Sequence, residues 1–289
     1  MTLPELYKSF VRAFEDISDS PAADARILIC TCLGLTQTQL ALATTEEVPT
    51  DKLPQLDALR AARCAGKPVA YLTGERGFYE SVFKVTEDTL IPRADTETLV
   101  EEALADIVER YQEQDSIRIL DLCCGTGCIG ISVTKVLSEC FDSVSLTLAD
   151  LSEKAMEVCR QNARELVIEE NIDLEFVVGD LFADVGDEPF DVILSNPPYI
   201  PSAVVPTLEK QVRYEPVMAL DGGADGLDFI RAISLGARTR LAPGGLLEME
   251  IGYDQGAAAT AILEDDGYSE VSIVKDLGNN DRVVKGYKD

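Results

Sequence analysis

The stretch IRILDLCCGTGCIG, residues 117–130, decides the fold of this chain. An apolar strand runs into a turn with closely spaced glycines, and a helical pattern follows it through Ile131, Val133, Val136 and Leu137. Glycine lets the backbone come close to a ligand, and the start of a helix offers free N–H groups. The stretch therefore predicts the strand–loop–helix unit of a nucleotide-binding α/β sheet.

This unit alone does not identify the ligand. Gly125, Gly127 and Gly130 have the G-x-G-x-x-G spacing of dinucleotide-binding folds. The features that separate the alternatives are Asp121, which opens the loop, and the residues at the ends of the following strands.

Acidic residues stand at the ends of the next two predicted strands. Residues 145–149 lead into Asp150, which is placed to accept hydrogen bonds from both hydroxyls of a ribose. Residues 174–178 lead to Asp180 and Leu181, which suit the amino group and the ring of adenine. Each acid alone is more typical of an ordinary strand end or helix cap. Together with the glycine loop, they predict a pocket for S-adenosylmethionine.

A fourth predicted strand, residues 190–195, runs into Asn196, Pro197, Pro198 and Tyr199. Proline fixes φ and has no N–H, so nearby carbonyls remain free to accept hydrogen bonds. The Asn196 side-chain oxygen and the Pro197 carbonyl can hold the two hydrogens of a planar NH2 group, and Tyr199 can cover its face. A bare Asn-Pro-Pro is also typical of a simple turn, but the preceding strand and the tyrosine favour a substrate clamp.

The chain contains no histidine. Mechanisms that require an imidazole base or a histidine-bound metal are therefore excluded. An amide nitrogen is a poor nucleophile, and accepting hydrogen bonds from both of its N–H groups raises its electron density and fixes its direction of attack. Because the sulfonium donor is already activated, geometry supplies most of the acceleration.

The chain resembles the release-factor glutamine methyltransferases (PrmC/HemK family) over nearly its whole length. The matching segments include residues 68–76, 91–101, the loop that Asp121 opens, and 196–201. Further along the chain they are residues 215–216, 219–223, 225–227, 250–252 with Gln255, 276–278 and 281–284. The segment Pro-Arg-Ala-Asp-Thr-Glu, residues 92–97, is similar to the release-factor group more than to the ribosomal-protein glutamine relatives. The resemblance implies methylation of the glutamine side-chain amide in the Gly-Gly-Gln loop of peptide-chain release factors. It also implies S-adenosyl-L-methionine as donor, S-adenosyl-L-homocysteine as product, and no metal.

The expected site follows from these motifs. Catalysis is assigned to Asn196, Pro197 and Tyr199, and substrate binding to these residues with Pro198. The expected cofactor-binding residues are Cys123, Cys124, Gly125, Thr126, Gly127, Asp150, Asp180, Leu181 and Asn196. Two residues depart from the family pattern, Cys123 where glycine is usual and Ala94 where proline is usual. A positive φ at Cys123 would be strained, and we expect weaker or slightly displaced cofactor binding there at worst.

Composition bounds the partners. The 289 residues include 25 basic and 52 acidic side chains, a net charge of −27. Such a chain repels phosphate backbones and attracts basic surfaces, which argues against a stable nucleic-acid partner, although the acidity also fits a general solubility role. With no apolar run of about 20 residues and no secretory signal, we expect a cytoplasmic monomer without a membrane span. The eight cysteines are not expected to form a disulfide framework. Cys30, Cys32, Cys123, Cys124 and Cys128 are expected to be small buried side chains, not metal ligands.

The predicted fold class is α/β: a doubly wound, Rossmann-like methyltransferase sheet with a small N-terminal helical-bundle domain and a β-hairpin connector. We expect the helical domain over residues 1–73, the connector over 74–94 and the methyltransferase domain over 95–289. The last two strands are expected near 246–251 and 283–288, separated by a helix near 255–265, with an antiparallel strand ending the sheet. The resemblance implies that the helical domain docks the release factor; a stabilising cap is the alternative.

Two other functions remain open at this point. An amine methyltransferase acting on nucleic-acid bases or on a ribosomal-protein glutamine shares the tetrapeptide at 196–199. A base-modifying enzyme should also show a basic groove, and none is evident. The second is a cofactor-binding interaction module without catalysis, which the intact clamp and both acids argue against.

Overall fold

The computed structural model describes the whole chain, residues 1–289. It divides into two compact units. One comprises Met1–Glu75 with Glu209–Tyr214, and the other comprises Arg76–Leu208 with Glu215–Asp289.

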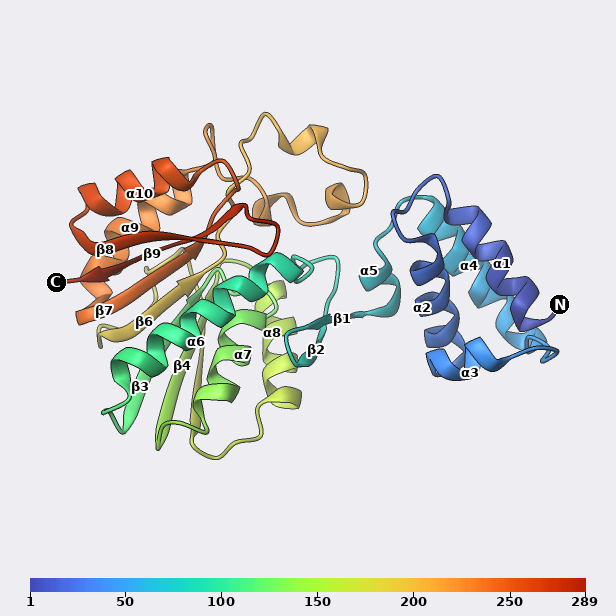
Figure 1. Cartoon of the computed structure of the whole chain (residues 1–289), viewed down its shortest axis with the longest axis horizontal. Coiled ribbons are helices and arrows are strands. Elements are labelled where there is room, and N and C mark those ends of the chain that lie inside the picture. Colours follow the sequence, from blue (N-terminus) through green and yellow to red (C-terminus); the bar gives the residue numbers. More distant parts are fainter. The chain divides into compact units, whose positions relative to one another are not determined.

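The first unit is helical (Figure 1). Its helices are α1 (Leu3–Phe14), α2 (Pro21–Leu33), α3 (Gln37–Leu42), α4 (Leu53–Cys64) and α5 (Val69–Thr73), with a 3-10 turn η1 (Thr50–Lys52) before α4. Leu6, Phe10 and Phe14 recur at helical spacing on α1 and are buried. The rings of Phe10 and Phe14 meet edge to face at 5.6 Å. This apolar stripe against α2 forms the core of the helical unit.

The segment Glu209–Tyr214 belongs to this helical unit although it lies far along the chain. Within the unit, the Tyr214 hydroxyl donates to the carbonyl of Ala65 at 3.2 Å. Nothing in the sequence pattern around Tyr214 indicates this placement, because it depends on a contact between distant residues.

The second unit is built on a seven-stranded sheet with the order β5-β4-β3-β6-β7-β9-β8. The strands are β3 (Ser116–Leu122), β4 (Ser143–Asp150), β5 (Ile172–Val178), β6 (Phe190–Ser195), β7 (Leu241–Glu250), β8 (Tyr268–Lys275) and β9 (Asp281–Lys288). Strands β3 to β7 are parallel, and β9 is antiparallel to both β7 and β8. The expected α/β class with an antiparallel end to the sheet is confirmed.

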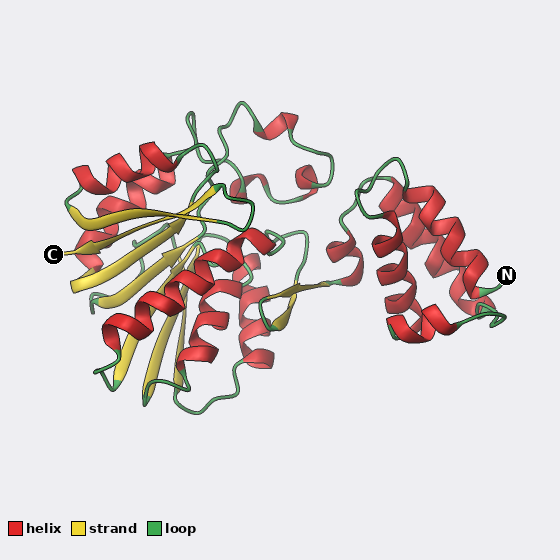
Figure 2. Ribbon diagram, in the orientation of Figure 1, coloured by secondary structure: helices red, strands yellow, loops and turns green.

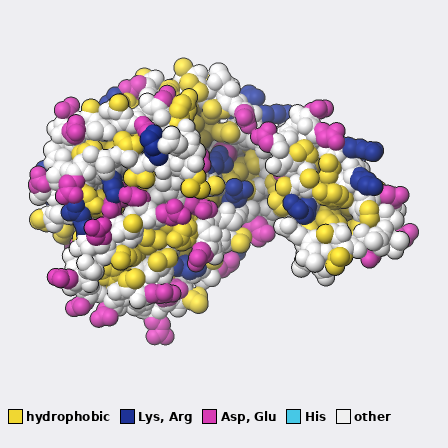
Figure 3. Space-filling model, viewed as in Figure 1, with side chains coloured by type: hydrophobic (Ala, Val, Ile, Leu, Met, Phe, Trp, Pro, Cys, Tyr) yellow, Lys and Arg dark blue, Asp and Glu magenta, His cyan; other side chains and the backbone are white.

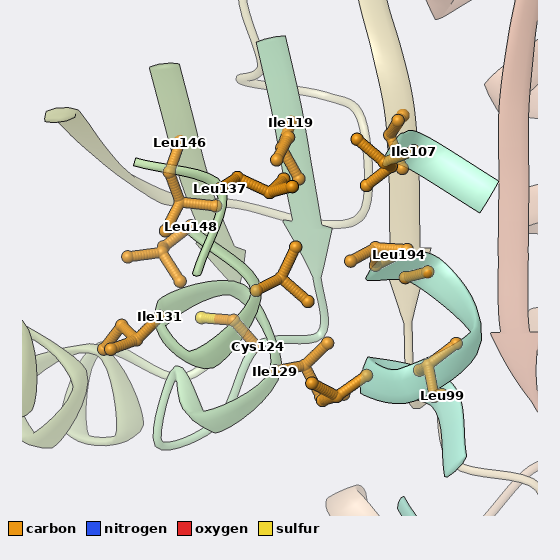
Figure 4. Close-up of a cluster of buried hydrophobic side chains, with 14 of the residues drawn as sticks. Leu99, Ile107, Ile119, Cys124, Ile129, Ile131, Leu137, Leu146, Leu148 and Leu194 are labelled. Carbon is orange, nitrogen blue, oxygen red and sulfur yellow. The ribbon is translucent and has the colours of Figure 1, made fainter. Parts of the chain in front are cut away.

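Helices cover both faces of this sheet (Figures 1 and 2). They are α6 (Glu97–Tyr111), α7 (Cys128–Leu137) and α8 (Glu153–Leu166) on one face, and α9 (Asp228–Arg240) and α10 (Gly256–Asp265) on the other. Figure 4 shows one core, where Leu99 and Ile107 of α6 and Ile131 of α7 meet strand residues such as Ile119 and Leu194. Burial on both faces explains the apolar centres of these strands, Ile119 and Leu120 in β3 and Val192, Ile193 and Leu194 in β6.

Short elements complete the second unit. Strands β1 (Glu75–Phe78) and β2 (Ser81–Lys84) form a separate two-stranded sheet within the predicted connector. A 3-10 turn η2 (Ala94–Thr96) precedes α6. The long connection between β6 and α9 carries the 3-10 turns η3 (Val205–Thr207) and η5 (Val217–Ala219). Between them, η4 (Val212–Tyr214) lies in the segment that belongs to the helical unit.

The structure has one more strand at the end of the sheet than the sequence predicts. The sequence interpretation placed a single strand after α10, whereas the structure has both β8 and β9 there. Strand β8 is at the sheet edge and alternates between more and less exposed positions. Polar residues interrupt the apolar residues of β8, so the sequence lacks the apolar run that identifies a buried strand. Polar residues are common in edge strands, which pair with a neighbour on one side only.

Glu248 on β7 gives a testable pH dependence. It is fully buried beside Asp106 and Lys285, and burial raises its pKa well above the ordinary value. The folded state therefore binds this proton more tightly than the unfolded state. The associated stability is complete below the unfolded pKa and is lost as pH rises towards the folded pKa.

We expect Glu248→Gln to increase the free energy of unfolding by about 1–3 kcal/mol at pH 8, because glutamine stays neutral. The gain should disappear near pH 4. Denaturant unfolding at a series of pH values measures it, with Glu139→Gln at an exposed position as the control. Parallel pH profiles for the wild type and Glu248→Gln would contradict the assignment.

Candidate functional site

The sheet places several candidate residues at one edge. From β3 the chain proceeds outward through β4 and β5, and then returns to the other side of β3 with β6. In open α/β sheets, ligands bind outside the carboxyl ends of the strands at such a reversal. Leu122 at the end of β3 is in register with Ala149 of β4 and Ser195 of β6. Cys123, Asp150 and Asn196 therefore follow at the same edge.

A cavity of about 390 Å³ opens at this edge. Its lining includes the candidate residues Cys123, Gly125, Asp150, Asn196 and Pro198. A second cavity of about 30 Å³ is lined by Cys123, Asp150, Asp180 and Leu181. The larger volume lies in the usual range of small-molecule sites. The strand-end residues proposed from sequence are thus brought together around shared space.

Asp150 is the best anchored of these side chains. Its Oδ2 accepts a hydrogen bond from the Gly125 N–H, and its Oδ1 accepts one from the Ser152 N–H, both at 2.8 Å. Burial raises the pKa of Asp150, and these N–H groups oppose the increase. Each oxygen keeps a lone pair, so the carboxylate can accept two further hydrogen bonds. That capacity matches the two hydroxyls of a ribose.

Asp121 has a different place. It is fully buried and absent from the lining of both cavities, and its Oδ2 accepts a hydrogen bond from the Gly130 N–H at 2.8 Å. Burial raises its pKa to about 7. Asp121 therefore ties the end of β3 to the first turn of α7 and shapes the loop between them.

Two lining residues have strained backbones. Cys123 has φ of 60° and Leu181 has φ of 50°, in the left-handed region. That region is costly for residues with a Cβ, and such strain gathers at functional sites. The positive φ at Cys123 explains why glycine is usual at this position of the loop.

We expect Cys123→Gly to stabilise the protein by about 1 kcal/mol, because relief of left-handed strain exceeds the added entropy of the unfolded chain. Cys123→Ala keeps the strain and should show no gain. Thermal unfolding with and without S-adenosylmethionine measures both effects. If alanine stabilised as much as glycine, backbone strain would not be the cause.

The Asn196 side chain is oriented by a neighbour. Its Nδ2 donates to the hydroxyl of Thr96 at 3.3 Å, while its Oδ1 accepts no hydrogen bond within the chain. Asn196 lines the larger cavity. The amide oxygen is thus available to accept from a ligand, as the clamp hypothesis requires.

Pro197 and Tyr199 do not line the cavity; Pro197 is buried and Tyr199 is half-buried. The Tyr199 hydroxyl donates to Glu250 Oε1 at 3.0 Å. Burial, and to a smaller extent the charge of Glu250, raises the pKa of Tyr199. The Tyr199 carbonyl accepts from Gln255 Nε2 at 2.9 Å. The roles of Pro197 and Tyr199 towards a substrate stay predictions.

Three of the expected cofactor-binding residues, Cys124, Thr126 and Gly127, do not line either cavity. The Cys124 N–H donates to the Ala149 carbonyl at 3.0 Å, and the Thr126 carbonyl accepts from Asn162 Nδ2 at 3.0 Å. Gly127 has φ of 77° and is the N-cap of α7, and a Cβ at this position would lie 2.8 Å from the sulfur of Cys159. In the structure these residues support the loop, and direct contact with a cofactor stays a prediction.

Sequence reasoning missed two cavity walls. One consists of residues 88–90 and the other of residues 216–219, with Phe229 beside them. Buried Glu215 joins the two walls, since its Oε2 accepts from the Ile91 N–H at 3.0 Å and its Oε1 from Arg93. The motifs at 91–93 and 215–216 were visible in the sequence, but their pairing depends on the fold.

Two absences concern metals and membranes. No group of three or more histidine, cysteine or acidic side chains could hold a metal ion. None of the helices has the length and apolar character needed to cross a membrane.

Comparison with known proteins covers nearly the whole chain. Residues 5–74 match the PrmC N-terminal domain, and residues 98–210 match the methyltransferase small domain. The release factor glutamine methyltransferase of Caulobacter vibrioides is 37% identical over 271 residues, which are 93% of this chain and 90% of the relative. That of Cereibacter sphaeroides is 39% identical over 267 residues, which are 92% of this chain and 91% of the relative.

Solved structures share the fold. The hMettl16 catalytic domain in complex with MAT2A 3′UTR hairpin 1 has a TM-score of 0.52 at 13% identity, covering 100% of this chain and 91% of that one. A delta-N METTL16 methyltransferase domain has a TM-score of 0.50 at 18% identity, covering 71% and 88%. At these identities, the likeness concerns the fold alone.

Proposed function

Since this chain belongs to the release factor glutamine methyltransferases, we propose that it methylates the side-chain amide nitrogen of the glutamine in the Gly-Gly-Gln loop of peptide-chain release factors. S-adenosyl-L-methionine supplies the electrophilic methyl group. The observation that carries the proposal is the free Oδ1 of Asn196 in a cavity shared with Asp150.

The residues that line the larger cavity fit the ribose of the methyl donor. Asp150 has two lone pairs left for the ribose hydroxyls. Asp180 and Leu181, the residues assigned to adenine, line only about 30 Å³ beside it, so we assign them to the edge of the ring. Gly125 and Cys123 leave the cavity floor free of large side chains. These groups bind and orient the donor, and no metal ligand is needed.

The substrate amide is held by acceptors. Asn196 Oδ1 and the Pro197 carbonyl each accept one N–H of the glutamine amide, which concentrates electron density on nitrogen and aims its lone pair. Holding the reactants in this geometry supplies most of the rate enhancement. After transfer the nitrogen is acidic, and its surplus proton passes to water. No basic side chain is required.

The charge distribution suits a basic protein partner. Acidic side chains are spread over the visible face of the larger unit (Figure 3), and the net charge of the chain is −27. We assign the helical unit a role in docking the release factor, and we place the protein in the cytoplasm as a monomer without a stable nucleic-acid partner.

Transfer of labelled methyl groups tests the function. The protein is incubated with labelled S-adenosylmethionine and a release factor, the same factor with its loop glutamine changed to alanine, a ribosomal protein, or DNA. Label is expected only on the intact release factor. Label on the alanine variant or on DNA alone would overturn the proposal, and label on the ribosomal protein alone would favour a related glutamine substrate.

A further inference from the structure

Two buried polar residues adjoin the substrate clamp without lining the cavity. Thr96 in η2 and Glu250 at the end of β7 are 2% and 1% exposed. Thr96 contacts Asn196, 100 residues away in the chain, and Glu250 contacts Tyr199. Burying a carboxylate and a hydroxyl is costly unless they have partners. Their position beside both polar ends of the 196–199 tetrapeptide suggests a role towards the clamp.

The clamp needs one of two orientations of the Asn196 amide. The oxygen and NH2 ends of an asparagine side chain have nearly the same shape but opposite hydrogen-bonding character. A substrate NH2 group requires the oxygen, and an inverted amide would set donor against donor. The hydrogen bond from Nδ2 to Thr96 Oγ1 directs the oxygen away from Thr96.

Thr96 can act as this acceptor only if its own hydroxyl hydrogen points elsewhere. Glu250 supplies a direction for it. One oxygen of its carboxylate accepts from Tyr199, and the other, Oε2, is buried without a hydrogen-bond partner and is thus a free acceptor. Burial raises the Glu250 pKa, and the hydroxyls of Thr96 and Tyr199 and the charge of Arg282 oppose this increase. An ionised carboxylate accepts hydrogen bonds and donates none. When ionised, Glu250 can therefore accept the Thr96 hydroxyl hydrogen at Oε2, which leaves the Thr96 oxygen lone pairs free for Asn196.

Arg282 is held close to Glu250 by its own hydrogen bonds. Its Nε and Nη2 donate to Asp276 Oδ2 at 3.1 and 3.0 Å, and its Nη1 donates to the Ile251 carbonyl at 3.4 Å. The guanidinium is thus fixed next to the residue that follows Glu250. A fixed positive charge there favours the ionised carboxylate.

We propose that Thr96 and Glu250 are positioning residues for methyl transfer, with Glu250 orienting the Thr96 hydroxyl and Thr96 holding the Asn196 amide with its oxygen towards the substrate. This inference rests on the proposed function for its kinetic consequence. The orientation of the amide itself is a property of the protein without substrate.

Kinetics provide the first test. Thr96→Val keeps the shape but removes the acceptor, and we expect kcat on the release factor to fall about tenfold, the worth of one hydrogen bond. KM for S-adenosylmethionine should be unchanged. Thr96→Ser should restore kcat to within about twofold, because it retains the hydroxyl. Thr134→Val is the matched control, since Thr134 is a fully buried threonine of α7 whose hydroxyl has no partner.

A double-mutant cycle tests the order of action. Glu250→Gln introduces a donor that competes for Thr96, so kcat should also fall about tenfold. If Glu250 acts through Thr96, the double variant Thr96→Val with Glu250→Gln should be no slower than either single variant. If the kcat of the double variant fell by the product of the two single losses, Glu250 would not act through Thr96.

The amide signals of Asn196 provide a test that requires no substrate. In protein labelled with nitrogen-15, the side-chain NH2 pair of Asn196 is identified by its absence from Asn196→Ala. We expect Thr96→Val to shift this pair and speed its hydrogen exchange, and Thr96→Ser to restore both. Unchanged signals in Thr96→Val would overturn the inference, whichever protein proves to be the substrate. Shifted signals with wild-type kcat would refute a role in catalysis.

Discussion

Asn196→Ala is expected to lower turnover on a release factor by about 10²–10³-fold, as for loss of other preorganised hydrogen-bonding groups in active sites. Asn196 Oδ1 is the one free side-chain acceptor of the tetrapeptide in the cavity. Without it, the amide nitrogen loses both an electron-donating contact and its fixed direction. Single-turnover methyl transfer at saturating S-adenosylmethionine measures the effect.

Cofactor affinity separates this result from general damage. The Kd of S-adenosylmethionine should change less than about fivefold in Asn196→Ala, because the ribose contacts remain. Asn171→Ala serves as a control for removing an asparagine outside the site, where its Nδ2 donates to the Ser138 and Phe141 carbonyls. Near-wild-type turnover in Asn196→Ala would refute the clamp.

Asp150→Ala is expected to raise the Kd of S-adenosylmethionine about 100-fold while leaving kcat at saturation nearly unchanged, since two hydrogen bonds to a charged group are lost. The same change releases the N–H groups of Gly125 and Ser152, so the glycine loop loses its tie to β4. Isothermal titration gives the affinity, and steady-state kinetics give kcat.

Asp150→Asn refines this prediction. One oxygen acceptor remains, so the Kd should lie between those of the wild type and Asp150→Ala. Asp142→Ala, at an exposed position before β4, is the control for removing an acidic side chain. A large fall in kcat with unchanged Kd in Asp150→Ala would remove Asp150 from the cofactor site.

The strand ends were predictable because their signals are local. A buried parallel strand is rich in apolar residues, and Asp150, Asp180 and Asn196 lie at or just beyond the ends of such strands. The glycine loop was equally local, and Cys123 has the positive φ that the sequence analysis described as strained for a cysteine. Strand β8 was missed because polar residues at exposed positions interrupt its apolar residues, as is common in an edge strand.

Residues that support the site were not predictable in the same way. Glu215 bonds to Ile91 and Arg93, and Thr96 bonds to Asn196, across separations of 100 residues or more. Motif resemblance marked these segments as important without indicating which side chains meet. Similarly, Cys124 and Thr126 belong to the predicted loop, but only the structure shows that they do not line the cavity and that their backbone groups bond to Ala149 and Asn162.

The amino-acid sequence alone was sufficient to predict the fold class and the family, because period, turn and strand-end signals act between near neighbours. The walls of the cavity, the orientation of the Asn196 amide and the buried contacts of Thr96 and Glu250 came from tertiary structure. These depend on groups brought together by packing of β3, β6 and β7 with η2, and a linear pattern does not encode hydrogen-bond geometry between segments so far apart.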